Sequence, residues 1–158
     1  MDFIVVFGSV YEHSPWVAEA VYPSLTPGTD AAAVAEQMRS VVDTASQKRK
    51  LALLCAHPDL AGRLSLAELT ESSRSEQTGA GLDRCTPEEL GEFQELNAAY
   101  TEKFGFPFIF AVKGYHRQDI LEAFRVRVNN SSDIEFKTAI EQVHRIAKLR
   151  LETMTNEN

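Results

Sequence analysis

The stretch "TPEELGEFQELNAAYTEKFG", residues 86–105, constrains the fold most, because it carries both a start and a stop signal for one helix. Thr86 suits the N-cap, Pro87 suits the first helical position and Glu89 completes a capping box. Gly105 is placed to end the helix. Between these ends, one face is formed at helical spacing by Leu90, Phe93, Leu96, Asn97, Tyr100 and Phe104.

Other stretches repeat this pattern. Asp30 is a predicted cap for helical sequence over 31–56, which is one long helix or two helices with a break near Ser46. Ser132 is the predicted cap of a last helix, and Glu135 sits three residues on as in a capping box. One face of this helix is lined by Phe136, Ile140, Val143, Ala147 and Leu151. A shorter helix is predicted within residues 118–128.

The stretch "GFPFIFAV", residues 105–112, does not fit a helix. It is rich in aromatic and β-branched residues and contains Pro107, so it is either a buried strand or an extended segment. "FIVVF" near the start could pair with it, but we favour an extended segment. We therefore predict an all-α, single-domain bundle of about six to eight helices over residues 1–158. A short frayed tail is expected at about 153–158.

Composition excludes several classes of protein. The formal charge is −7 and the basic residues are scattered, which argues against nucleic-acid binding. No apolar run approaches the roughly 20 residues of a membrane span. The start lacks the basic region of a signal peptide, the end is not a peroxisomal signal, and Cys55 and Cys85 lack metal-ligand spacing. We expect a cytoplasmic protein with no nucleic-acid or membrane partner.

His57 is the first candidate for chemistry. It ends the apolar run in "LALLCAHPDLAG", residues 51–62, and Pro58 follows it. A residue before proline is pushed out of the α region, so His57 is expected at the end of a helix. The helix dipole there favours a protonated imidazole, which is a good general acid. A helix-end histidine bonded to a backbone carbonyl is the alternative.

A second candidate is "SSRSEQTGAGLD", residues 72–83, which we expect to be a loop. Such a loop can offer Ser73, Glu76 and Gln77 to a small polar ligand, and its glycines allow close approach of the backbone. The alternative is a plain linker between helices.

Backbone groups and arginines supply the remaining candidates. The segment "KFGFPFIF" can present backbone N–H groups to an oxyanion, or it is plain core. Arg145 or Arg150 could grip a carboxylate, although most helical arginines are solvated. There is no Gly-rich phosphate loop, no nucleophile elbow and only one Glu-x-x-His pair. These absences suggest chemistry without a metal or organic cofactor.

Four segments together resemble the 2-oxo-4-hydroxy-4-carboxy-5-ureidoimidazoline (OHCU) decarboxylase family. They are "YEHSPWVAEA", "HPDLAG", "SSRSEQTGAGLD" and "NAAYTEKFGFPFIFAV", in this order. The resemblance runs from Phe3 to about Leu151. It implies an all-helical fold, commonly a homodimer, no cofactor and no metal. The family's enzyme completes the conversion of urate to allantoin.

The resemblance also implies roles for residues. His57 matches the catalytic histidine and Glu76 the essential glutamate. Ser73 matches the binding hydroxyl and Pro58 shapes the pocket. The substrate also meets the backbone of Phe108, Ile109 and Phe110, with Ile109 first.

A late arginine holds the substrate in the family. Its position on the last helix suggests Arg150, with Arg145 as the rival. The expected function is cofactor-independent decarboxylation of OHCU, a small ureidoimidazoline, to (S)-allantoin. The alternatives are a non-enzymatic helical module that binds a ureide or a peptide, and a hydrolase in which His57 and Glu76 activate water on a ureido group.

Overall fold

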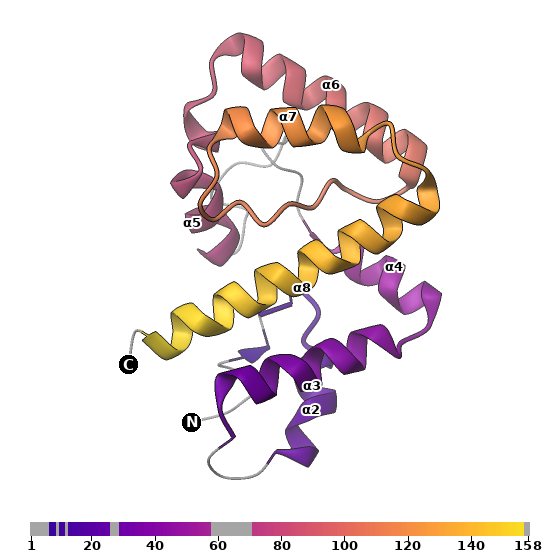
Figure 1. Ribbon diagram of the computed structural model, residues 1–158, viewed down its shortest axis with the longest axis vertical. Helices are drawn as coiled ribbons and strands as arrows, with labels where there is room; N and C mark the ends of the chain where they lie inside the picture. The colour runs from indigo at the N-terminus through magenta and orange to yellow at the C-terminus, as the bar shows by residue number, and fades with distance from the viewer. Residues whose placement is uncertain (1–6, 9, 12, 26–28, 58–70, 157–158) are drawn as a thin grey trace. The chain divides into compact units, whose positions relative to one another are not determined.

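The computed structural model describes residues 7–8, 10–11, 13–25, 29–57 and 71–156 (Figure 1). In this part of the chain every regular element is helical and no strand is present, so the predicted all-α fold is confirmed. The elements are α2 (Trp16–Val21), η1 (Tyr22–Ser24), α3 (Ala31–Asp43), α4 (Gln47–Cys55), α5 (Glu71–Gly79), η3 (Leu82–Arg84), α6 (Pro87–Phe104), α7 (Arg117–Arg127) and α8 (Ser132–Asn156).

The chain forms two compact units. One unit contains Met1–Ala56 and Val143–Asn158, and the other contains His57–Gln142. Helix α8 contributes residues to both. It reaches Asn156, into the stretch expected as a frayed tail.

The first unit is built on α2, α3, α4 and the later part of α8. The Asp30 carboxylate accepts a 2.8 Å hydrogen bond from the Ala33 N–H and caps α3. The Ser46 hydroxyl accepts from the Arg49 N–H at 3.2 Å and caps α4. The helical sequence over 31–56 is therefore two helices, because the Ser46 cap starts a new one. The buried apolar residues of this unit include Met38, Val42, Leu53, Leu54 and Leu151.

The second unit is built around α6, whose ends are as predicted. The Thr86 hydroxyl accepts from the Glu89 N–H at 3.1 Å, and the Glu89 carboxylate accepts from the Thr86 N–H at 3.0 Å. Gly105 ends the helix in the left-handed region with φ 78°. Phe93 and Tyr100 on the buried face of α6 lie against Phe124 of α7.

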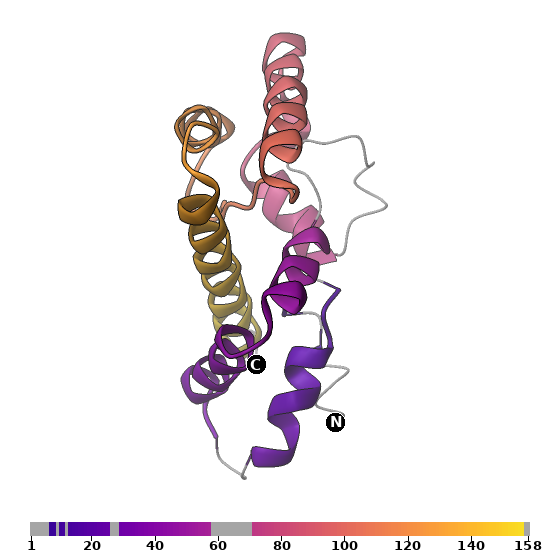
Figure 2. The same cartoon turned by 90° about the vertical axis from the view of Figure 1, so that its right-hand side faces the viewer.

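The connection from α6 to α7 contains the predicted extended aromatic segment. Residues 107–112 form neither helix nor strand. Figure 2 shows this connection as an irregular ribbon leading from α6 to α7. Phe106, Phe108 and Ile109 are buried, so the segment belongs to the core of its unit although it is not helical.

The predicted start of α8 is wrong by one residue. Ser132 is the first helical residue, and the hydroxyl of Ser131 accepts from the Ile134 N–H at 3.4 Å. Glu135 does not form a capping box, because its carboxylate is fully buried in an ion pair with Arg127.

Candidate active site

His57 lies directly after α4, as predicted. The helix ends at Cys55, and the N–H of its C-cap Ala56 still donates to the Ala52 carbonyl at 3.1 Å. The His57 side chain is buried, with 8% of its surface exposed. Pro58 and the rest of the His-Pro-Asp-Leu motif lie outside the described residues.

The stretch expected as a loop is largely helical, and this expectation was wrong. Helix α5 spans Glu71–Gly79, and neither glycine nor proline occurs within residues 71–78 to break it. Within α5, Gln77 is buried and Glu76 is half-buried. Ser73 lies one turn earlier in the same helix, and its side chain is outside what the structure describes. A helix holds these residues more rigidly than a loop does.

The end of α5 is tied to the start of α7. The Arg117 backbone N–H donates to the Ala80 carbonyl at 3.0 Å, and the Arg117 guanidinium donates to Glu89 at 2.9 Å. A Cβ atom on Gly81 would lie 3.1 Å from the guanidinium, and Gly81 has φ 80°. The capping N–H of Thr86 and then Arg117 hold the pKa of the Glu89 carboxyl below its usual value. These contacts place the helix that carries Glu76 and Gln77.

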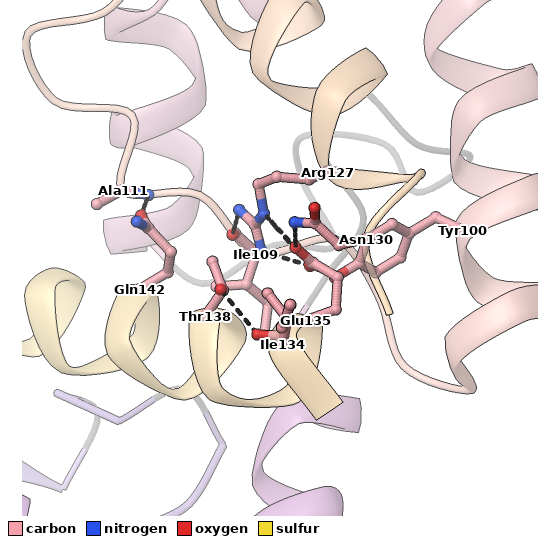
Figure 3. A network of polar contacts seen from close by, with 9 residues as sticks. All are labelled: Tyr100, Ile109, Ala111, Arg127, Asn130, Ile134, Glu135, Thr138 and Gln142. Atoms are coloured by element: carbon pink, nitrogen blue, oxygen red, sulfur yellow. Dashed lines mark hydrogen bonds and ion pairs between the residues drawn. The ribbon is translucent and has the colours of Figure 1, made fainter. Parts of the chain in front are cut away.

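The aromatic segment is held through its backbone (Figure 3). The Ile109 carbonyl accepts from the Arg127 Nη1 atom at 2.7 Å. The Ala111 N–H donates to the Gln142 Oε1 atom at 2.8 Å. Phe108 and Ile109 are buried, and Phe110 is half-buried.

Sequence reasoning missed the network that makes the first of these contacts. Arg127 donates to the fully buried Glu135 carboxylate from Nε at 3.0 Å and from Nη2 at 2.9 Å. The Tyr100 hydroxyl also donates to Glu135, and the Asn130 side-chain amide does so at 3.1 Å. Tyr100 was expected only on an apolar face, and Glu135 only in a cap. No local sequence signal pairs Glu135 with Arg127, 8 positions away, or with Tyr100, 35 positions away.

The charges of this network follow from its contacts. Burial raises the pKa of the Glu135 carboxyl, but hydrogen bonds from Arg127 and Tyr100 outweigh burial, and the pKa lies below its usual value. Burial and the bond to Glu135 raise the pKa of the Tyr100 hydroxyl. At neutral pH, Glu135 is therefore ionised and Tyr100 keeps its proton.

The two candidate arginines of α8 differ in burial. Arg150 is buried with 7% exposed, and its Nη1 atom donates to the Val10 carbonyl at 3.3 Å. Arg145 is exposed. Both belong to the unit formed by Met1–Ala56 and Val143–Asn158, whereas His57 and α5 belong to the other unit.

A second buried polar cluster, also unexpected, lies in the unit of Arg150. His144 is buried, with Nδ1 2.8 Å from the Tyr11 hydroxyl and Nε2 2.9 Å from the Asp43 carboxylate. These contacts link α8 to α3 and to the chain before α2. Both ring nitrogens of His144 therefore have partners within the fold, and the histidine of the single Glu-x-x-His pair has a structural role.

The described residues carry neither a metal-binding cluster nor a membrane-spanning helix. Among the described residues, no group of three or more His, Cys, Asp or Glu side chains could hold a metal ion. No helix in that part of the chain is long and apolar enough to cross a membrane.

Comparison with known proteins places the chain in a family. The family model of OHCU decarboxylase matches residues 1–152. The chain belongs to the OHCU decarboxylase family. This confirms the resemblance carried by the four sequence segments. It is a family of carboxy-lyases, and an enzyme of this class is what the sequence predicted.

Relatives and solved structures agree with this assignment. The chain is 44% identical over 150 residues to the 2-oxo-4-hydroxy-4-carboxy-5-ureidoimidazoline decarboxylase of Haloferax volcanii, covering 95% of this chain and 87% of that protein. It is 36% identical to the uric acid degradation bifunctional protein PucL of Bacillus subtilis, covering 95% of this chain and 30% of that protein.

Among solved structures, a crystal structure of (S)-allantoin synthase superposes with a TM-score of 0.75 at 36% identity, covering 95% of this chain and 48% of that one. A crystal structure of OHCU decarboxylase in the presence of (S)-allantoin gives a TM-score of 0.74 at 23% identity, covering 92% and 94%, and supports the fold.

Proposed function

We propose that this protein decarboxylates OHCU to (S)-allantoin, the last step of urate oxidation to allantoin. The observation that carries the proposal is the family match across residues 1–152, which spans every residue of the proposed site. Relatives that share 36–44% identity over about 95% of the chain carry the names of this activity or of uric acid degradation.

The substrate itself explains why no cofactor is required. Loss of carbon dioxide leaves an electron pair on carbon, and the imidazolinone carbonyl of the substrate can accept it. The protein must hold the carboxylate, stabilise the enolate-like intermediate and deliver one proton to one face. We therefore propose a reaction independent of metal and organic cofactors.

His57 is the proposed general acid. It follows the C-terminal end of α4, where its side chain is buried. Its burial keeps the proton away from bulk water. Delivery of that proton from one side gives a single enantiomer of allantoin.

Helix α5 supplies the proposed orienting groups. Glu76 accepts hydrogen bonds from ring or ureido N–H groups, and the Gln77 amide and Ser73 hydroxyl add neutral contacts. The arrangement is supported by the helical position of all three residues and by the burial of Gln77. Pro58 is proposed to shape the pocket next to His57.

Substrate oxygens are the proposed partners of the backbone at Phe108, Ile109 and Phe110 and of an arginine. Arg150 is our choice over Arg145, because Arg150 is buried and Arg145 is exposed. A buried guanidinium binds a carboxylate through two hydrogen bonds with little competition from water. We also propose that the chain forms a single domain, that it assembles as a homodimer and that it is located in the cytoplasm.

The test measures (S)-allantoin by circular dichroism, with OHCU generated in situ from urate. The wild type should accelerate a single-handed signal. His57→Asn removes the proposed acid and should lower the rate by about 10²–10⁴-fold. Glu76→Ala should lower it by about 10²-fold through lost orientation. Both should approach the spontaneous rate and a racemic product.

Matched controls are His116→Asn and Glu95→Ala, because both residues are exposed. Asparagine also suits the N-cap position that His116 occupies in α7. Each control should stay close to the wild-type rate. A wild type that binds the substrate without turnover would indicate a binding module, and release of ammonia or a ring-opened acid would indicate a hydrolase.

A further inference from the structure

The backbone of the aromatic segment is bound by two side chains. Arg127 at the end of α7 donates to the Ile109 carbonyl, and Gln142 of α8 accepts from the Ala111 N–H, at 2.7 and 2.8 Å (Figure 3). These two contacts fix the peptide groups on both sides of Phe110.

The geometry of a trans peptide then orients Phe110. In a trans peptide group the C=O and the following N–H point in opposite directions, and these peptide bonds are trans. Because the Ile109 carbonyl points at Arg127, the Phe110 N–H points away from Arg127. By the same rule, the Phe110 carbonyl points away from Gln142. Among the residues that the structure describes, neither backbone group of Phe110 has a hydrogen-bond partner.

Arg127 also holds the neighbouring ring. Its guanidinium carbon lies 4.4 Å from the centre of the Phe108 ring. The Phe124 ring stacks on Phe108 with centroids 3.8 Å apart. Phe108 is 1% exposed, so its position in the segment is fixed by packing as well as by charge.

Arg127 can act as a rigid clamp because Glu135 holds it. The carboxylate takes the Nε and Nη2 hydrogens and leaves Nη1 for the Ile109 carbonyl. A lysine has one ammonium group and cannot reproduce this planar fork. The Glu135 carboxylate also accepts hydrogen bonds from the Tyr100 hydroxyl and the Asn130 side-chain amide.

We infer that Arg127, held by Glu135, is a positioning residue that aims the Phe110 N–H at a substrate oxygen. This inference rests on the proposed function. It moves the main backbone donor from the expected Ile109 to Phe110. The Arg127–Glu135 ion pair then has a role in the reaction, because it holds the Phe110 N–H in place before negative charge develops on the substrate oxygen.

The first experiment uses Arg127→Lys, with Arg125→Lys as the matched control. Arg125 lies on the same helix and pairs with Glu92 through Nε at 2.7 Å, on the surface. At a temperature where circular dichroism shows folded protein, Arg127→Lys should lower kcat by about 10–100-fold, with a smaller change in KM. Arg125→Lys should stay close to the wild-type values.

The second readout follows the Phe110 amide by NMR in the full chain. Saturating (S)-allantoin should slow hydrogen exchange of this amide in the wild type, and the protection should be lost in Arg127→Lys. A general loss of stability would instead speed exchange at protected amides throughout the unit, with and without (S)-allantoin. Gln142→Met, which removes the Ala111 partner, is the second variant if Arg127→Lys does not fold, and it should lower kcat in the same direction.

The outcomes separate the two proposals. An active wild type whose folded Arg127→Lys variant keeps full kcat, or whose Phe110 amide is unchanged by bound (S)-allantoin, overturns this inference alone. A wild type that neither binds (S)-allantoin nor accelerates decarboxylation overturns the proposed function, and this inference with it.

Discussion

The Glu135 carboxylate shows, at the scale of a residue, how a buried charge is stabilised. Leaving water is unfavourable for a carboxylate, and burial is the largest influence on its pKa. The Arg127 fork and the Tyr100 hydroxyl outweigh this effect. The same carboxylate helps to raise the pKa of Tyr100, so the phenol remains a donor. Each group therefore maintains the charge state that the other requires.

The Tyr100 hydroxyl should contribute measurably to stability. Tyr100→Phe removes a donor to a buried charge and leaves the ring packing intact, so it should lower the free energy of unfolding by about 1.5–3 kcal/mol. Urea unfolding measures the change. Tyr22→Phe is the control, because Tyr22 is 57% exposed. Equal, small changes in both variants would contradict the importance of the bond to Glu135.

At the scale of an element, helix ends are decided by one or two residues. α6 starts at a Thr86–Glu89 capping box and stops at Gly105. The chain after Gly105 cannot continue as a helix past Pro107, and its aromatic side chains gain more by burial in an extended path. Arg127 and Gln142 then bind its backbone.

Replacement by alanine should change the free energy of unfolding in opposite directions at Gly91, inside α6, and at Gly105, its C-cap. Gly105→Ala should lower the free energy of unfolding by about 1 kcal/mol, because its φ of 78° disfavours a side chain. Gly91→Ala, inside α6, should raise it by about 0.8–1 kcal/mol through higher helix propensity. A new Cβ atom at either site meets nothing within 4 Å, so backbone conformation alone is tested. Thermal and urea unfolding would show the two signs, and a shift in the same direction would contradict this account.

The molecule as a whole carries a net charge of −7, and the carboxylate of Glu135 is completely buried. A carboxyl with a lowered pKa in the folded state contributes stability above its unfolded pKa. That contribution is lost as the pH falls below the ordinary value of 4.5 and through the lower folded value. Acid should therefore destabilise the protein partly through Glu135.

Glu135→Gln should reveal this dependence in urea unfolding at about pH 6 and pH 3. The variant should be less stable at the higher pH by about 3–5 kcal/mol, since Arg127 loses its buried partner. Its stability should then fall less on acidification than that of the wild type. Glu92→Gln is the control, because its Arg125 pair lies on the surface, where such pairs contribute little. Parallel pH profiles for wild type and Glu135→Gln would contradict the assignment.

The sequence predicts candidate site residues from signals that are local. The helix end at His57 follows from Pro58, Glu76 lies in one of the family segments, and Arg150 follows only from its position on the last helix. Sequence alone did not predict that Glu76 lies in a helix, since the serines and glycines around it suggested a loop. It favoured Arg150 over Arg145 by position alone, and the difference in burial between the two arginines appears only in the folded chain.

By itself, then, the sequence determined the family, most of the helices and the caps at Asp30 and Thr86, because periodicity and capping act within a few residues of the chain. Tertiary structure decided which buried polar groups meet. Glu135 binds residues 8 and 35 positions away, and His144 binds Tyr11 across 133 positions. Pairs at such separations follow no period and form only when packing removes water from both partners. For that reason, the Arg127 clamp on the aromatic segment emerged only from the folded molecule.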